Sequence, residues 1–162
     1  MFGPVRGPWR DPRALPSEQW TGWWGDEPPF HHPVFVLTHH PRESLTMAGG
    51  TTFHFVGPNG IRGGLNGLLD LAFEAAGGQD VRLGGGVATI HQFLRAGLID
   101  EMRLAFVPVL LGRGERLFDN LGDEAIGYER VDMVCSASAT HVRFVRKATS
   151  SAAAPPVGGT TA

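Results

Sequence analysis

The chain has 162 residues, of which 42% are hydrophobic, and it carries a formal net charge of -2 at pH 7. This length is sufficient to bury a substantial core in one domain, and the near balance of charges excludes the basic surface of a nucleic-acid-binding protein. No apolar run reaches the roughly 18 residues of a membrane span, and the single cysteine, Cys135, excludes an intrachain disulfide. We expect a cytoplasmic protein without nucleic-acid or membrane partners, with Cys135 as a buried small side chain.

Residues 1–33 are rich in proline, glycine and tryptophan, and only 16–24 have helix potential. They predict a long structured surface loop, and loops of such length usually serve a site or belong to a larger unit. The continuous apolar run Val34–Leu37 predicts a strand covered on both faces. Thr51–Val56 predicts a second strand, which ends at the turn-forming residues 57–60.

Two amphipathic helices follow. Gly77-Gly78 supplies the C-terminal stop of the first helix, which is predicted by apolar residues at helical spacing: Ile61, Leu65, Leu68, Leu69, Ala72, Phe73 and Ala76. The segment Val81–Leu83 predicts a short strand, and a glycine turn leads from it into the second helix. The apolar positions of that helix run from Val87 to Leu98, and Gly97 is its stop signal.

The last part of the chain is rich in β-forming residues. Residues 102–111 predict a strand in which Pro108 requires an edge position or a bulge. Tyr128–Cys135 and Thr140–Arg146 are close enough in sequence to form an antiparallel pair. Small residues and two prolines predict a disordered tail over 148–162. Helices that alternate with strands before a terminal hairpin predict a mixed α/β fold.

The three glycines Gly84–Gly86 and the start of the next helix form a candidate phosphate site. A helix N-terminus that follows a strand offers unpaired N–H groups and the positive end of the helix dipole. Glycines let a ligand approach the backbone, and the Thr89 hydroxyl adds a donor. A glycine triplet alone is also compatible with a simple tight turn.

Two other phosphate-binding motifs fit this segment less well. A P-loop is excluded, because no Gly-Lys-Ser/Thr follows the glycines. A Rossmann fingerprint is disfavoured, because Thr89 stands where its third small residue belongs. The nearest acid, Asp100, ends the helix instead of following a second strand, where a ribose-binding acid is needed.

A second cluster, Thr38-His39-His40-Pro41-Arg42, follows the first apolar strand. At the carboxyl end of a strand, such residues suit the extra phosphate of NADPH, with Arg42 as a fixed charge and His39 or His40 as a donor when protonated. A solvated turn is the alternative interpretation.

These segments resemble a known family. The glycine turn continuing through Leu94–Met102, and then the run Val107–Phe118, are similar to the C-terminal reductase domain of the bacterial riboflavin-biosynthesis deaminase-reductase, in the dihydrofolate-reductase-like superfamily. The resemblance spans roughly residues 20–147. It implies a mixed, mainly parallel sheet flanked by helices with a C-terminal antiparallel hairpin, NADPH as hydride donor, and frequently a homodimer.

The resemblance also assigns cofactor residues by position. It assigns to the diphosphate-binding turn Gly84, Gly85, Gly86, Val87 and Ala88. At the strand end that meets the adenosine 2′-phosphate, it assigns four residues: Leu37, Thr38, His39 and Arg42. Expected nearer the substrate are Phe118, Trp20, Trp23 and Trp24. Ordinary core or loop packing is the alternative for these aromatic residues. No catalytic residue is carried over.

Family members begin with a strand, a helix and a second strand ending in Gly-Arg, ahead of the position that matches the start of this chain. We therefore expect residues 1–147 to form an N-terminally incomplete reductase domain, which turns over substrate only when extended upstream. The expected reaction is NADPH-dependent reduction of a small heterocycle resembling a pterin or a ribosylaminopyrimidine. The alternative is a non-catalytic remnant of this fold that binds nucleotide or pairs with another subunit.

Other candidate side chains are weaker. No metal site is expected at His31-His32 or His39-His40, because adjacent strand residues point to opposite faces and no cysteine lies nearby. Four acids are possible acid-base groups by residue type only, and solvated surface charge is the expectation for each: Asp70, Glu74, Asp100 and Glu101.

Overall fold

The computed structural model describes residues 24–57, 62–122 and 127–148. The predictions for residues 1–23, including Trp20 and Trp23, for Ile61 and for residues 149–162 lie outside these ranges. The described chain is a mixed α/β protein with two helices and two three-stranded sheets. It divides into two compact units, Met1–Gln92 and Phe93–Ala162, and the boundary falls within the second helix.

The sheet of the first unit has the strand order β1-β3-β2. Strand β1 (Pro33–Leu37) pairs in parallel with β3 (Thr52–Val56), and the short β2 (Leu45–Thr46) pairs antiparallel with β3. A single 3-10 turn, η2 (Ala48–Gly50), connects β2 to β3. The two apolar strands predicted from the sequence are thus confirmed, and they are direct neighbours.

One face of this sheet carries the core of the first unit. Phe53 is fully buried and Phe55 nearly so, because strand alternation directs both rings to the same face. The partly buried residues that pack against this pair are Phe30, Val34, Val36, Leu45 and Met47. Thr51 is also fully buried, and it is satisfied by donating to the Pro28 carbonyl and accepting from the His31 amide.

Helix α1 (Gly64–Ala76) follows in the first unit. Leu68 is buried and its neighbours Leu65 and Leu69 are half-buried, whereas Phe73 is exposed. The predicted stop is confirmed: Gly77 adopts the left-handed conformation with φ 56° and its N–H bonds to the Glu74 carbonyl. None of the described helices is long and apolar enough to cross a membrane.

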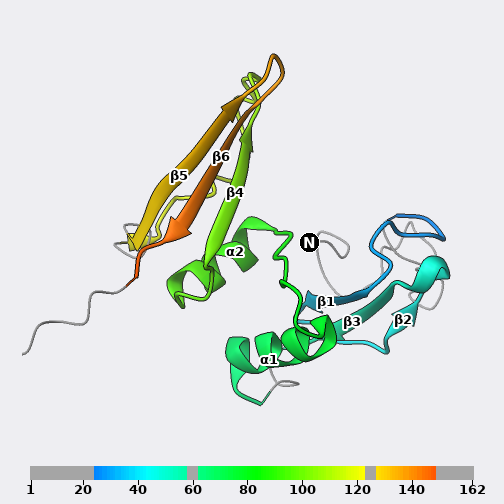
Figure 1. The fold of residues 1–162 in the computed structure, drawn as a ribbon. Helices are drawn as coiled ribbons and strands as arrows, with labels where there is room; N and C mark the ends of the chain where they lie inside the picture. Colours follow the sequence, from blue (N-terminus) through cyan, green and yellow to red (C-terminus); the bar gives the residue numbers. More distant parts are fainter. Residues whose placement is uncertain (1–23, 58–61, 123–126, 149–162) are drawn as a thin grey trace, which may run out of the picture. The chain divides into compact units, whose positions relative to one another are not determined.

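The second unit contains an antiparallel sheet of order β4-β6-β5, drawn in Figure 1 as three long adjacent arrows. Its strands are β4 (Glu101–Phe106), β5 (Tyr128–Cys135) and β6 (Thr140–Arg146). The predicted hairpin is confirmed, with a bulge between Arg130 and Asp132. The turn is closed by the Ser136 amide, which bonds to the Ala139 carbonyl at 2.8 Å.

Helix α2 (Val87–Arg95) ends at a two-bond motif built on Gly97, which has φ +64°. The Gly97 amide bonds to the Leu94 carbonyl at 3.0 Å and the Leu98 amide to the Phe93 carbonyl at 2.9 Å, the pattern of a Schellman cap. The glycine stop is confirmed, but the helix ends at Arg95, not at Leu98. The buried apolar side chains of the second unit are Phe93, Leu94, Leu121 and Val142.

Three further expectations need correction. Val81–Leu83 is not a strand, because no described strand pairs with it and its Arg82 and Leu83 are exposed. The strand expected over 102–111 ends at Phe106, before Pro108, which has no N–H for a ladder. Cys135 is exposed instead of buried, because it lies at the end of β5 next to the hairpin turn.

The expected single, mainly parallel sheet is not confirmed. Within the described residues β1 with β3 is the parallel pair, and the other three strand pairings are antiparallel. Composition and alternation predict strands, whereas strand direction depends on which distant segments pair.

We predict that Phe53→Ala lowers the free energy of unfolding of the first unit by about 3–5 kcal/mol, the usual cost of an emptied aromatic site. Phe53 is fully buried in that unit's core, so removal of its ring leaves a cavity and the neighbouring side chains lose their contacts with it. Chemical denaturation followed by circular dichroism measures the change. The control Leu71→Ala removes an exposed side chain from α1 and should change stability by less than about 0.5 kcal/mol.

We predict that Tyr128 titrates above its ordinary pKa. Burial raises the pKa, Arg146 opposes the rise and Asp100 adds to it, while the hydroxyl donates to the Ile99 carbonyl at 2.6 Å. Because the folded-state pKa is raised, this contribution to stability is present below about pH 10 and lost as pH rises through the folded value. The chain has one tyrosine, so tyrosinate absorbance reports this residue alone. A titration unchanged by denaturant would contradict the prediction.

Candidate functional site

The carboxyl ends of β1 and β3 form one edge of the first unit's sheet. Because the two strands are parallel and in register from Pro33 with Thr52 to Leu37 with Val56, they end together. The amide of Thr38 continues the ladder by donating to the Val56 carbonyl at 3.0 Å. The carboxyl edge of parallel strands is the usual location of ligands in α/β folds, and it is where residues 38–42, here called the cationic turn, begin.

The cationic turn folds back over the end of β3. Its His40 amide donates to the Thr38 hydroxyl at 3.1 Å, which closes a tight local turn. Pro41 lies against Gly57, where an added Cβ would be 3.2 Å from the proline Cγ. The Arg42 guanidinium carbon is 5.4 Å from the centre of the Phe55 ring, a cation–π arrangement. The side chains of His39 and His40 are exposed between these anchors.

The glycine turn, residues 84–86, leads directly into α2, as predicted. Gly85 has φ +113°, a conformation that favours glycine, and no heavy atom lies within 4 Å of where a Cβ on Gly84 would be. The backbone of the turn is therefore open to a ligand. The positive φ of Gly85 and the open space at Gly84 fit a ligand group that must approach the main chain closely.

The first turn of α2 is available for an anion. The Gly86 carbonyl accepts from the amides of Thr89 and Ile90, both at 3.0 Å. The amides of Val87 and Ala88 precede them, at positions where a helix provides no carbonyl partner. Ala88 is exposed and no acidic residue stands in the first turn, so nothing there repels negative charge.

Both predicted halves of the cofactor site belong to the first unit. Leu37 ends β1 and is half-buried, Thr38 and Arg42 are half-buried, and His39 is exposed. The contacts described above hold each turn separately, the cationic turn on β3 and the glycine turn on α2. Their use by one ligand therefore remains a prediction.

Trp24 belongs to an aromatic cluster of the first unit. Its ring packs edge-on against Phe30 at 5.8 Å, and Phe30 packs edge-on against Phe53 at 6.3 Å. Phe53 lies near the amino end of β3, so Trp24 is anchored at the end of the parallel pair opposite the cationic turn. The substrate-side role expected for Trp24 stays a prediction.

Phe118 lines an open depression of about 430 Å³ in the second unit. The depression is mostly apolar, and the residues around it are Leu104, Ala105, Phe106, Arg116, Leu117, Phe118 and Asp119. Sequence reasoning singled out Phe118 but missed Leu104 and Phe106, since strand alternation alone does not show which face a distant loop will cover.

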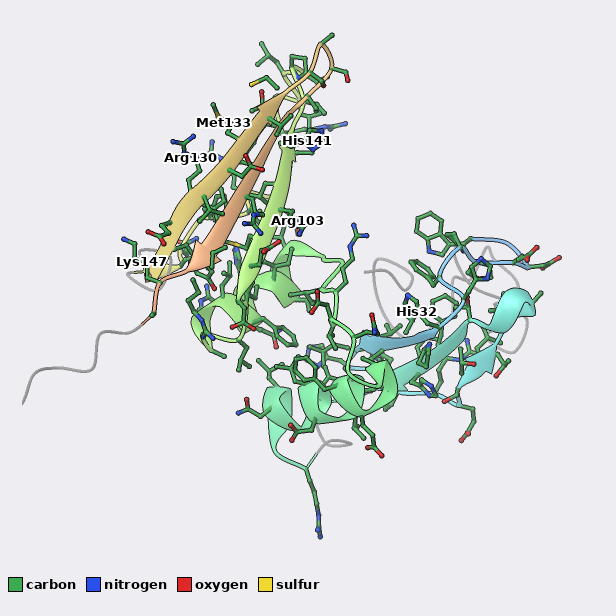
Figure 2. All side chains as sticks on the ribbon, in the orientation of Figure 1. His32, Arg103, Arg130, Met133, His141 and Lys147 are labelled. Carbon is green, nitrogen blue, oxygen red and sulfur yellow. The ribbon has the colours of Figure 1, made fainter. Side chains whose placement is uncertain are left out.

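Of the four candidate acids, two are exposed on α1 and two form ion pairs with arginines. Asp70 and Glu74 are exposed on α1, and Asp100 pairs with Arg146 at 2.5 Å. Glu101 bridges Arg103 and Arg143, which lie directly opposite each other on β4 and β6. The hydrogen bond from Arg103 is the main reason that the pKa of Glu101 lies below its ordinary value. Figure 2 labels Arg103, Arg130 and His141 on the three strands of this sheet.

One polar pair was missed by sequence reasoning. The Ser44 hydroxyl lies 3.0 Å from His54 Nδ1, and the His54 ring stacks on Phe35 at 5.2 Å. The strand register determines the stacking of His54 on Phe35, because the two residues lie directly opposite each other in the parallel pair. In the part of the chain that the structure describes, no three His, Cys, Asp or Glu side chains gather as metal ligands would.

Comparison with known proteins assigns the chain to a family. The model of the RibD C-terminal domain matches residues 65–146, about half of the chain, including the glycine turn, α2 and the whole antiparallel sheet. The chain belongs to the RibD C-terminal domain family.

A relative of the chain is the uncharacterized protein YyaP of Bacillus subtilis (strain 168). The two are 49% identical over 41 residues, which make up 25% of this chain and 22% of YyaP. The match thus spans about a fifth of that protein.

Proposed function

We propose that the chain is an NADPH-dependent reductase that acts by hydride transfer on a small heterocyclic substrate of the pterin or ribosylaminopyrimidine type. The observation that carries the proposal is the family match, which includes the glycine turn and the start of α2. Reductase domains of this family typically use NADPH. The family also links the chain to a reductase role in riboflavin biosynthesis.

In this proposal the glycine turn and α2 hold the cofactor diphosphate. The amides of Val87 and Ala88 donate to its oxygens, the helix dipole favours the charge, and the open side of Gly84 admits the group. Thr89 is the additional hydroxyl donor. These groups orient the cofactor and do not react themselves.

The cationic turn then holds the adenosine 2′-phosphate. Leu37 and Thr38 continue the backbone ladder to the carboxyl edge of the parallel strands, while Arg42 supplies positive charge and His39 a ring N–H donor. NADPH, when bound, supplies the hydride from its nicotinamide. The chain contributes orientation through two separate anchors, which is how a fixed geometry lowers the barrier to transfer.

We predict that NADPH at a hundred times its dissociation constant stabilises the chain by about 2.7 kcal/mol. Ala88→Asp should weaken NADPH binding by about fivefold or more, because a charge about 4 Å from a phosphate costs at least ~1 kcal/mol. The same substitution should leave folding intact or improve it, since an acid in a first helical turn is favourable by about 0.3–1 kcal/mol. Thermal unfolding and calorimetric titration measure both effects. The control Ala88→Asn adds similar bulk without charge, and equal loss in both variants would contradict the diphosphate site.

We predict that Arg42→Ala lowers the affinity for NADPH while leaving that for NADH unchanged. The reason is that the two nucleotides differ only in the 2′-phosphate that Arg42 is proposed to face. Because hydrogen bonds to charged groups contribute about 1.5–3 kcal/mol, the loss should be on the order of tenfold to a hundredfold. Parallel titrations with both nucleotides provide the measurement. If both affinities fell equally, Arg42 would have only a structural role.

A second candidate function, pairing with another copy of the chain, is favoured by one feature of the second unit. After β4 the chain exposes consecutive large apolar side chains, among them Val107, Leu110 and Leu111, with Leu110 fully exposed. Monomeric proteins rarely expose such contiguous apolar surface. Sedimentation at increasing concentration should show dimers, and Leu110→Asp should shift the species to monomer. A monomer at all concentrations would exclude this candidate.

A further inference from the structure

The cationic turn is held by the last residues of β3 and by the first residue after it. The Thr38 amide bonds to the Val56 carbonyl, Pro41 lies against Gly57, and the Arg42 guanidinium lies over Phe55. Phe55, Val56 and Gly57 are consecutive in sequence. One short segment of β3 therefore shapes the whole turn.

Arg42 is lodged against the sheet instead of extending into solvent. The residue is half-buried, its Nη1 atom has almost no accessible surface, and its guanidinium carbon lies over the Phe55 ring, 5.4 Å from the ring centre. A guanidinium that stacks on a ring keeps its charge in one place and loses less side-chain freedom when it binds an anion. The Phe55 ring is itself fixed by the core of the first unit.

The position of Arg42 also depends on Gly57, because the Gly57 backbone lies close to Pro41. It is buried, and a Cβ there would be 3.2 Å from Pro41 Cγ and 3.3 Å from Pro41 Cδ, tighter than ordinary contacts. Any larger residue must push Pro41 outward, and Arg42 is the next residue along the chain.

We propose that Phe55 and Gly57 are positioning residues that set the preference for NADPH over NADH by holding Arg42 where the 2′-phosphate binds. This inference rests on the proposed function. Neither residue touches the nucleotide in this proposal. Both act through Arg42, so they should affect NADPH and leave NADH unaffected.

The first test is Phe55→Leu, which keeps an apolar core residue and removes the ring beneath the guanidinium. The ratio of NADH to NADPH dissociation constants should fall by about fivefold, the scale of one cation–π contact, while the NADH value stays constant. The matched control is Phe53→Leu. That residue is fully buried in the same core, and its ring packs edge-on against Phe30.

Gly57→Ala is the second variant, and it leaves the core rings in place. It should lower the same ratio by displacing Pro41, and it keeps the test decisive if Phe55→Leu does not fold. Its control is Gly127→Ala, because among the described residues no atom outside its chain neighbours lies within 4 Å of the added Cβ, and the backbone there needs no positive φ.

The outcomes separate this inference from the proposed function. A reduced ratio in Phe55→Leu and Gly57→Ala, with both controls unchanged, supports it. An unchanged ratio in both variants, or an equal fall in Phe53→Leu, overturns it while nucleotide binding by the parent chain stands. A parent chain that binds neither nucleotide overturns the proposed function and this inference together.

Discussion

The parallel pairing of β1 with β3 is the constraint on which the site in the first unit depends. It brings Leu37 and Val56 to the same edge, and the Thr38 amide then extends the ladder beyond the strand. The same pairing buries Phe53 and Phe55 on one face, so the core and the cationic turn share their supporting residues. A change that weakens this pair should therefore affect the packing of the core and the position of the cationic turn together.

The glycine turn depends on a different and more local kind of order. Gly85 accepts a positive φ, the Gly86 carbonyl caps the first turn of α2, and Gly97 closes the last turn. Glycines thus define both ends of a nine-residue helix. The amino end remains open, and the positive end of the helix dipole there favours an anion. The carboxyl end is closed by backbone bonds.

In the antiparallel sheet of the second unit, acidic side chains offset a like-charge pair that the strand register creates. Arg103 and Arg143 lie directly opposite each other, an arrangement that is unfavourable alone. Glu101 bonds to both, and Asp132 lies opposite Arg143 on the other side. Of the four acids considered as possible acid-base groups, Glu101 is the partner of these arginines and Asp100 pairs with Arg146, so residue type alone was a poor guide to chemistry.

The sequence by itself determined the features that depend on neighbours along the chain. Helical spacing and the stops at Gly77 and Gly97 predicted the helices, alternation predicted the terminal hairpin, and ordered motifs from residue 84 onward predicted the family. Only the tertiary structure decided that residues 81–83 have no strand partner, that Cys135 is exposed, and that Arg42 rests on Phe55. The physical reason is that caps and periodicity are local, whereas ladders, burial and ring contacts join residues far apart in sequence.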